Sequence, residues 1–512
     1  MLSAILILAF FPSFQCSRDR PNFVLLFADD YGWGDLGANW ETTKETPNLD
    51  RLAATGIRFT DFHAGASVCT PSRASLLTGR LGIRTGVTHN FNPMSKYGLP
   101  LNETTTAEML KKAGYSTGMI GKWHLGQNGS YHPINRGFDF YYGIPYSNDM
   151  GCVDDPGYDL PMKKPCPKSD HDRRSSLLFE SASGELALPL YHNLKIIEQP
   201  VNLDTLSDRY KTMADEFLSN QTADKPFFLY VAFAHMHVPQ NHNPKYSNAS
   251  TRKTIFADTL LEMDSTVGVI VDSLQRNGLT NNTLVWFTGD NGPWDSKCNL
   301  TGTAGPYQGL WEKKNSSGST CKFTTWEGGH REPGIVAWPG RIRPRVSNAL
   351  VSALDVLPTF SALARAPLPA NRMFDGIDIS HVLLNGSEAG HKFLAHPNSG
   401  ASGLKGDLDT LRKGDWKIMY QTGGAKPCNH SGGKSIRHDP PLLFNIKDDM
   451  QESTALDVTK KPYAQVLAEM KQLLSQIMES IAKDNTTVAN YDEDKNARPC
   501  CNSSHVACRC TV

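Results

Sequence analysis

Three apolar runs along the chain each end abruptly in polar residues. They cover residues 23–28, 227–234 and 284–288. Runs this continuous are typical of strands that are buried on both faces in a parallel sheet. Amphipathic stretches between them predict helices over residues 106–113, 206–219 and 254–277. The pattern therefore predicts an α/β fold with a large, mostly parallel sheet sandwiched by helices.

The amino-acid composition changes near residue 386, after which Gly, Asn, Ser and Lys become more frequent. Short strand-like segments follow at residues 416–420 and 440–445, and residues 464–482 have helical periodicity. We expect a large domain over residues 17–385 and a smaller C-terminal α+β domain over residues 386–512, which ends in a cysteine-rich tail.

The first eleven residues are almost wholly apolar but too few to span a bilayer, which predicts a signal peptide over residues 1–16. The alternative is an N-terminal core strand. Eleven N-x-S/T sequons favour passage through the secretory pathway, to the lysosome or the cell exterior. They start at Asn102, Asn128, Asn220, Asn248, Asn281, Asn299, Asn315, Asn385, Asn429, Asn485 and Asn502.

Composition excludes two classes of partner. The chain of 512 residues has 52 Lys and Arg against 52 Asp and Glu, so it lacks the positive charge of a nucleic-acid binder or a membrane-surface protein. Beyond the N-terminus no apolar run reaches about 18 residues, which argues against a membrane span.

The eleven cysteines agree with an oxidising compartment. Cys500, Cys501, Cys508 and Cys510 crowd the tail with spacings that suit a disulfide knot; a metal cluster is the alternative. Cys152 and Cys166 flank a loop rich in Pro and Asp and could close it. Cys298, Cys321 and Cys428 leave at least one thiol over if Cys69 has another task.

The polar residues that end two of the apolar runs offer metal ligands. Asp29, Asp30 and Asp290 supply carboxylates, and Asn291 supplies an amide oxygen. In an open α/β sheet they would gather in the crevice at the carboxyl ends of the strands, where a cation would offset their repulsion. Hard oxygen ligands favour Ca²⁺ or Mg²⁺ over zinc. The alternative for any one Asp is a helix cap or a turn.

Residues 69–79, CTPSRASLLTG, are the most specific feature of the sequence. Pro71 suits a first helical turn and Gly79 can end the helix, so Cys69 would lie at the helix N-terminus, where anions are favoured. Arg73, one turn later, can point back to the same pocket. A lone cysteine before a helix is more often structural.

A second run, GYSTGMIGKWH at residues 114–124, places Lys122 and His124 two positions apart at the end of an expected strand. Residues two apart on a strand face the same side, so both side chains could reach one ligand. The alternative is that both are surface residues.

Together these two runs resemble the two signatures of the sulfatase family, each matched in full. Asp29-Asp30, the DNGP run at residues 290–293 and the WEGG run at residues 326–329 strengthen the resemblance, which covers nearly the whole chain after residue 16. The cysteine-rich tail and residues 35–40 and 234–239 resemble the arylsulfatases within that family. The resemblance implies the mixed, mostly parallel α/β sandwich that sulfatases share with alkaline phosphatase.

The resemblance also implies a chemistry. Cys69 would be oxidised to formylglycine by the formylglycine-generating enzyme. One hydroxyl of its hydrated aldehyde attacks sulfur, and the other, once deprotonated, expels sulfate. One Ca²⁺ per subunit would be held by residue 69 and the ligands named above. The remaining implied roles are anchoring of the nucleophile and anion by Arg73 and Lys122, sulfate binding by Lys322, a base at His124, a leaving-group acid at His237 and a substrate contact at Ser147.

The implied activity is hydrolysis of sulfate esters, both aryl sulfates and sulfated glycans, with a 3-O-sulfated glucosamine of heparan sulfate as the expected natural substrate and an acidic pH optimum. Two alternatives stay open: a phosphatase or phosphodiesterase of the same superfamily, and a non-catalytic glycan-binding relative. The implied disulfides join Cys500 and Cys501 to Cys508 and Cys510, and Cys298 to Cys428, which leaves Cys321 as the spare thiol.

Overall fold

The computed structural model describes residues 20–40, 42–169, 186–222 and 224–510. The expected signal peptide, residues 1–16, lies outside the described residues.

The larger sheet has eleven strands within the described ranges, in the order β10-β2-β9-β8-β1-β7-β3-β4-β5-β6, with β11 paired to β2. The five central strands, from β8 to β4, run parallel, whereas β9 and β5 are antiparallel to their neighbours. The expectation of a mixed, mostly parallel sheet is confirmed. The strands are β1 (Asn22–Ala28), β2 (Ile57–His63), β3 (Ser116–Gly121), β4 (Phe140–Gly143), β5 (Leu190–His192), β6 (Lys195–Glu198), β7 (Phe227–Ala232), β8 (Thr283–Gly289), β9 (Arg331–Ala337), β10 (Arg345–Ser347) and β11 (Val351–Ser352).

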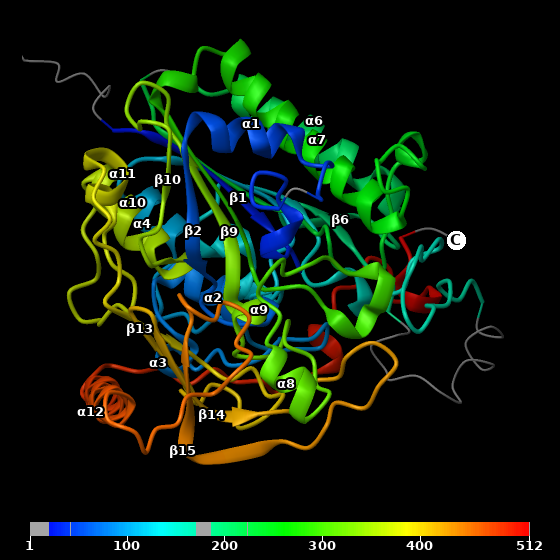
Figure 1. The fold of residues 1–512 in the computed structure, drawn as a ribbon. Coiled ribbons are helices and arrows are strands. Elements are labelled where there is room, and N and C mark those ends of the chain that lie inside the picture. The colour runs from blue at the N-terminus through cyan, green and yellow to red at the C-terminus, as the bar shows by residue number, and fades with distance from the viewer. Residues whose placement is uncertain (1–19, 41, 170–185, 223, 511–512) are drawn as a thin grey trace, which may run out of the picture.

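Helices cover both faces of this sheet (Figure 1). In β1, Phe23, Leu25 and Phe27 enter one apolar core, and the residues between them enter the core on the opposite face. Both faces are therefore buried, which explains why the strand sequence is apolar without alternation. One face carries α2 (Cys69–Thr78), α4 (Thr106–Lys112) and α10 (Val356–Ala364), and the other carries α1 (Pro47–Thr55), α6 (Leu206–Ser219) and α7 (Ile255–Arg276).

The three helices expected over residues 106–113, 206–219 and 254–277 correspond to α4, α6 and α7 and match them to within one residue at each end. Among the described residues this part of the chain also has shorter α-helices: α3 (Gly82–Thr85), α8 (Leu310–Asn315), α9 (Glu327–His330) and α11 (Ser380–Asn385). No helix in the described ranges is long and apolar enough to cross a membrane.

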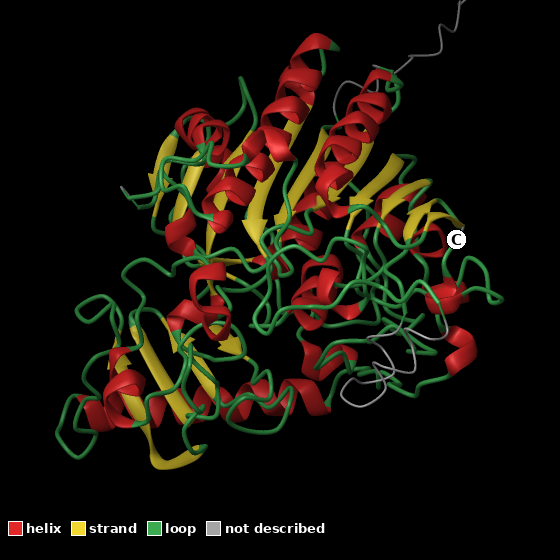
Figure 2. Cartoon of the chain, turned by 90° about the vertical axis from the view of Figure 1, so that its right-hand side faces the viewer, coloured by secondary structure: helices red, strands yellow, loops and turns green. Residues whose placement is uncertain are grey.

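A smaller antiparallel sheet lies apart from the larger one (Figure 2), in the order β12-β13-β14-β15. Helix α12 (Tyr463–Ala482) packs on it through Leu467, Met470 and Ile477, which confirms the expected helix and the α+β character of this unit. The boundary at residue 385 stays a prediction. The four strands are β12 (Phe393–His396), β13 (Thr410–Lys413), β14 (Trp416–Thr422) and β15 (Ile436–Asn445).

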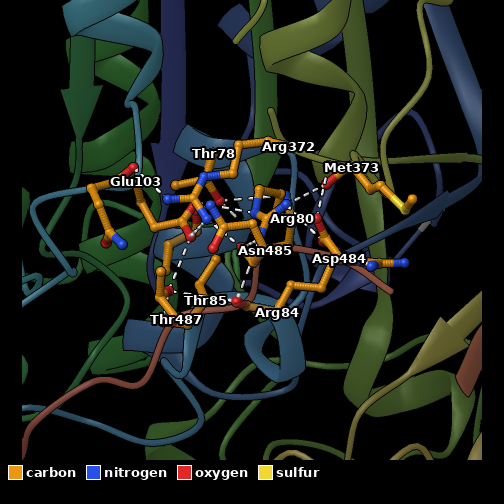
Figure 3. Close-up of polar contacts among 12 residues, drawn as sticks. Thr78, Arg80, Arg84, Thr85, Glu103, Arg372, Met373, Asp484, Asn485 and Thr487 are labelled. Carbon is orange, nitrogen blue, oxygen red and sulfur yellow. Dashed lines mark hydrogen bonds and ion pairs between the residues drawn. The ribbon is translucent and has the colours of Figure 1, made fainter. Parts of the chain in front are cut away.

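Ion pairs tie the segment after α12 back to the larger unit (Figure 3). Arg80 lies between Glu103 and Asp484, with N–O distances of 3.1 and 3.0 Å. Arg84 contacts the same Asp484 at 2.9 Å, and the Thr487 hydroxyl donates to Glu103. The segment that directly follows α12 is therefore held next to α2 and α3.

The expected disulfides are confirmed. Bonds join Cys152 to Cys166, Cys298 to Cys428, Cys500 to Cys508 and Cys501 to Cys510. Among the described residues Cys69 and Cys321 stay free, and both are buried.

Candidate active site

The expected ligands meet because they follow two neighbouring strands. β1 and β8 are parallel, and Ala28 pairs with Gly289, so Asp29-Asp30 and Asp290-Asn291 leave the same edge of the sheet. The Asp30 amide donates to Asp290 Oδ1 at 3.1 Å, and Asn291 Nδ2 donates to Asp30 Oδ1 at 2.8 Å. All four residues are buried.

Cys69 is the first residue of the buried helix α2, and Gly79 ends the helix with a φ of 66°. Its Sγ atom lies 3.6 Å from Asp29 Oδ1. Burial raises the pKa of the Cys69 thiol to about 12. An unmodified Cys69 would therefore stay protonated at physiological pH and would be a poor nucleophile.

Three cations face the three carboxylates. Arg73 NH2 lies 2.7 Å from Asp290 Oδ2 and 3.6 Å from Asp29 Oδ2. Lys122 forms a close ion pair with Asp29. The Lys322 Nζ atom lies 2.5 Å from Asp30 Oδ1. All six side chains are buried, so their interactions are weakly screened by solvent.

This pairing still leaves groups that fit a bound cation. Burial and the neighbouring Asp29 raise the pKa of Asp290 to about 7, and the same two causes raise the pKa of Asp30. The buried Oδ1 of Asn291 has no hydrogen-bond partner among the described residues. Ligand atoms of Asp29, Asp30, Cys69 and His237 all lie within 4.8 Å of one another. An oxygen-rich set with an unpartnered amide oxygen fits Ca²⁺ or Mg²⁺.

His237 is oriented toward this group. Its Nδ1 atom lies 2.7 Å from the Val238 carbonyl oxygen, which can only accept, so Nδ1 carries the hydrogen. Its Nε2 atom lies 3.7 Å from Asp30 Oδ2. Burial and the nearby Lys322 lower the pKa of His237 to about 3.

His124 and Ser147 form a contact of their own. His124 Nε2 donates to the Phe91 carbonyl at 3.0 Å, which leaves Nδ1 as an acceptor 3.4 Å from Ser147 Oγ. Burial, with Lys122 and Arg73 nearby, lowers the pKa of His124 well below its ordinary 6.5. His124 is therefore a neutral imidazole beside the charged group.

The prediction that Lys122 and His124 lie two apart on a strand and face the same side is wrong. β3 ends at Gly121, and His124 has a φ of 59°, which no strand residue adopts. Lys122 turns to Asp29, whereas His124 turns to Phe91 and Ser147. The His124 amide donates to the Pro145 carbonyl at 3.0 Å, and this bond to the loop after β4 stabilises the bend.

Comparison with known protein families matches residues 21–366 to the sulfatase model and residues 389–510 to the C-terminal region of aryl-sulfatase. The chain belongs to the sulfatase family.

Individual sulfatases agree over nearly the full length. The chain is 53% identical to arylsulfatase G of Canis lupus familiaris, over 98% of this chain and 93% of the relative. It is 40% identical to arylsulfatase A of Homo sapiens, over 88% and 87%. The crystal structure of the PsFucS1 sulfatase from Pseudoalteromonas sp. is similar with a TM-score of 0.77 and 27% identity, over 92% of each chain. The protein is thus an arylsulfatase-type sulfatase, an enzyme.

Three further residues lie beside the predicted site residues and were not predicted from the sequence. Asp149 Oδ1 lies 3.9 Å from His237 Nδ1, and the Trp294 ring centroid lies 5.3 Å from that of His237. Glu332 is buried beside Asp290, and burial raises its pKa well above the ordinary value. Two signals were available: Trp294 directly follows the DNGP run, and Glu332 is an acid inside a buried strand.

Proposed function

We propose that this sulfatase hydrolyses sulfate esters of glycans, with a terminal 3-O-sulfated glucosamine of heparan sulfate as its natural substrate, and that it also cleaves aryl sulfates. It works with one Ca²⁺ and with a formylglycine made from Cys69. The observation that carries this proposal is the position of Cys69, the first residue of a complete signature, 3.6 Å from an acid of the cation-binding group.

Asp29, Asp30, Asp290 and Asn291 would hold the calcium ion, together with residue 69. When bound, the ion polarises a sulfate oxygen and lowers the pKa of the attacking hydroxyl. Two observations support this role. The Asn291 oxygen has no partner among the described residues, and burial with Asp29 raises the pKa of Asp290, which a bound cation would lower.

Formylglycine requires the formylglycine-generating enzyme as a partner during maturation. Its hydrated aldehyde supplies one hydroxyl for attack on sulfur and a second for release of sulfate. The high pKa of the Cys69 thiol supports the need for this modification.

The remaining residues bind the anion and move protons. Lys122 and Lys322 hold sulfate oxygens, and Arg73 fixes Asp290 through its 2.7 Å ion pair. His237 donates a proton to the leaving oxygen from Nε2, because its Nδ1 is held by the Val238 carbonyl. His124 is the neutral base that its low pKa predicts, and Ser147, on its Nδ1 side, contacts the substrate.

An acidic compartment suits the proposed proton-transfer roles of His237 and His124. His237 acts as an acid only when protonated, and a bound sulfate monoester adds the negative charge that raises its pKa. We therefore expect an optimum below about 6.5, the ordinary pKa of histidine. With the apolar N-terminus and the sequons, this favours the lysosome, with secretion as the second route.

Peptide mass spectrometry of the active protein tests the chemistry, and a saccharide panel tests the substrate. We expect an aldehyde or its hydrate at residue 69, and release of sulfate from saccharides that end in 3-O-sulfated glucosamine. An active preparation with an unmodified thiol throughout would refute the formylglycine mechanism. Hydrolysis of aryl sulfates but of no saccharide end would refute the glycan substrate alone.

A further inference from the structure

Trp294 lies beside Lys322 and His237, two residues of the proposed site. It is half-buried, whereas the groups beside it are buried: His237 is 4% exposed and Lys322 is 2% exposed. The Lys322 Nζ atom is 4.3 Å from the indole ring centroid, and the His237 ring centroid is 5.3 Å away. Trp294 thus borders both the anion-binding lysine and the leaving-group acid.

The position of His237 limits where the substrate ring can lie. A proton donor lies about 3 Å from the oxygen that it protonates. The first ring carbon of an aryl or sugar ester is one bond further on. A ring attached to that oxygen would lie next to His237, and Trp294 is the half-buried aromatic side chain in ring contact with His237.

The indole is held firmly in this place. Lys297 Nζ lies 4.5 Å from its ring centroid and is itself fixed by Asp159 Oδ1 at 2.7 Å. Phe323 meets the ring edge-on at 5.9 Å, and the Cys298–Cys428 disulfide anchors the loop to the smaller unit. Such support keeps an aromatic side chain ready for a ligand rather than free to collapse.

We propose that Trp294 is a substrate-binding residue, the apolar wall against which the pyranose or aryl ring bearing the ester oxygen packs. This inference rests on the proposed function of the site. Its indole nitrogen makes no hydrogen bond to a described residue, so it is also available to a substrate hydroxyl.

The test compares Trp294→Ala and Trp294→Phe with the parent chain, using 4-nitrophenyl sulfate and a saccharide that ends in 3-O-sulfated glucosamine. In Trp294→Ala we expect KM to rise about tenfold, because the lost contact covers a large part of one ring. We expect kcat to change little. Trp294→Phe keeps the apolar wall and should stay within about threefold of the parent.

Inhibition by inorganic sulfate separates ring binding from an indirect effect on Lys322, because sulfate lacks the ring. Its Ki should stay within about twofold in Trp294→Ala. An unchanged KM, or a Ki that rises in step with KM, would overturn the inference. Trp416→Ala, which removes a half-buried tryptophan against Tyr463 in the smaller unit, is the control and should change neither constant. A parent chain that cleaves neither ester would refute the proposed function instead.

Discussion

Two buried clusters in this chain each contain three carboxylates and three cations, yet their charges are paired differently. The active-site cluster follows the strand ends and consists of Asp29, Asp30, Asp290, Arg73, Lys122 and Lys322. The interdomain cluster lies between the two sheets and consists of Asp61, Glu327, Glu452, Arg331, Arg412 and Lys417.

The interdomain cluster neutralises itself. Glu327 contacts Arg331 at 2.8 Å, Lys417 at 3.0 Å and Arg412 at 3.3 Å. Although burial opposes ionisation, these cations hold the pKa of Glu327 well below its ordinary value. Glu452 is the exception, since burial and Glu327 raise its pKa to about 6.

In the active-site cluster the cations do not offset the effect of burial at every carboxyl group. Two of its three carboxyl groups, Asp30 and Asp290, have raised pKa values, and burial raises the pKa of the neighbouring Glu332 well above its ordinary value. Equal counts of charge therefore do not imply equal function. We expect the interdomain cluster to stabilise the fold, and we propose that the active-site cluster is completed by a bound cation and the substrate anion.

Cys69→Ala gives the largest expected effect and should separate chemistry from folding. Without the nucleophile, kcat for 4-nitrophenyl sulfate should fall by about 10⁴-fold or more. The thermal midpoint should stay close to that of the parent, because Cys69 carries no charge of the cluster. Residual turnover within tenfold of the parent would place the nucleophile elsewhere.

Glu327→Gln should lower the stability of the fold and leave the catalytic site unchanged. It leaves three buried cations without their shared carboxylate, and breaking a buried pair costs about 3–5 kcal/mol. We expect a large fall in the denaturant midpoint, while KM for 4-nitrophenyl sulfate in the folded fraction is unchanged. Lys413→Gln, which removes an exposed pair with Glu469, is the control and should shift the midpoint little. Equal midpoints for both variants would show that the interdomain cluster does not stabilise the fold.

Asp290→Asn removes one negative charge from the active-site cluster and tests whether Asp290 is a calcium ligand. The amide oxygen can still accept from the Asp30 amide, but one carboxylate of the active-site cluster is gone. Calcium affinity should fall at least about 100-fold, since even outer-shell partners are worth about 10–100-fold. The metal-free variant should lose less stability than Glu327→Gln does, because Arg73 keeps Asp29 at 3.6 Å. Unchanged calcium affinity by calorimetry would exclude Asp290 as a ligand.

His330→Gln gives the smallest expected effect and concerns pH. His330 is buried beside the interdomain cluster and stacks on His396 at 4.4 Å, and burial lowers its pKa to about 3. The unfolded chain, with a pKa near 6.5, binds this proton first, so the histidine reduces stability as pH falls below 6.5. One such group contributes up to about 1.4 kcal/mol per pH unit. Thermal midpoints measured from pH 7 to 5 should therefore fall less steeply in the variant. Equal slopes would contradict the assignment.

Local patterns in the sequence predicted most of the fold. A strand that is buried on both faces is apolar at every position, and a helix with one buried face, such as α6 or α7, is apolar every three to four residues. Both patterns can therefore be recognised in the sequence alone. The ligands that follow β1 and β8 were predictable for the same reason, because parallel strands end at one edge of a sheet. Lys322 and His237 were assigned by resemblance rather than by pattern.

Contacts between residues far apart along the chain could not be predicted from local sequence patterns. The interdomain cluster joins Asp61 to Arg412 and Glu327 to Lys417, which are far apart along the chain and belong to no common motif. The bend at His124 depends on a bond to the Pro145 carbonyl, which strand alternation cannot anticipate. Trp294 shows its relevance only once Lys322 and His237 are placed beside it.

The difference between the two clusters is tested most directly by sulfate release from 4-nitrophenyl sulfate, measured on metal-stripped protein as Ca²⁺ is added back. We predict no turnover in the stripped protein and full recovery at one Ca²⁺ per chain. Full activity without metal, or recovery with Zn²⁺ but not with Ca²⁺, would contradict the proposal that calcium completes the active-site cluster.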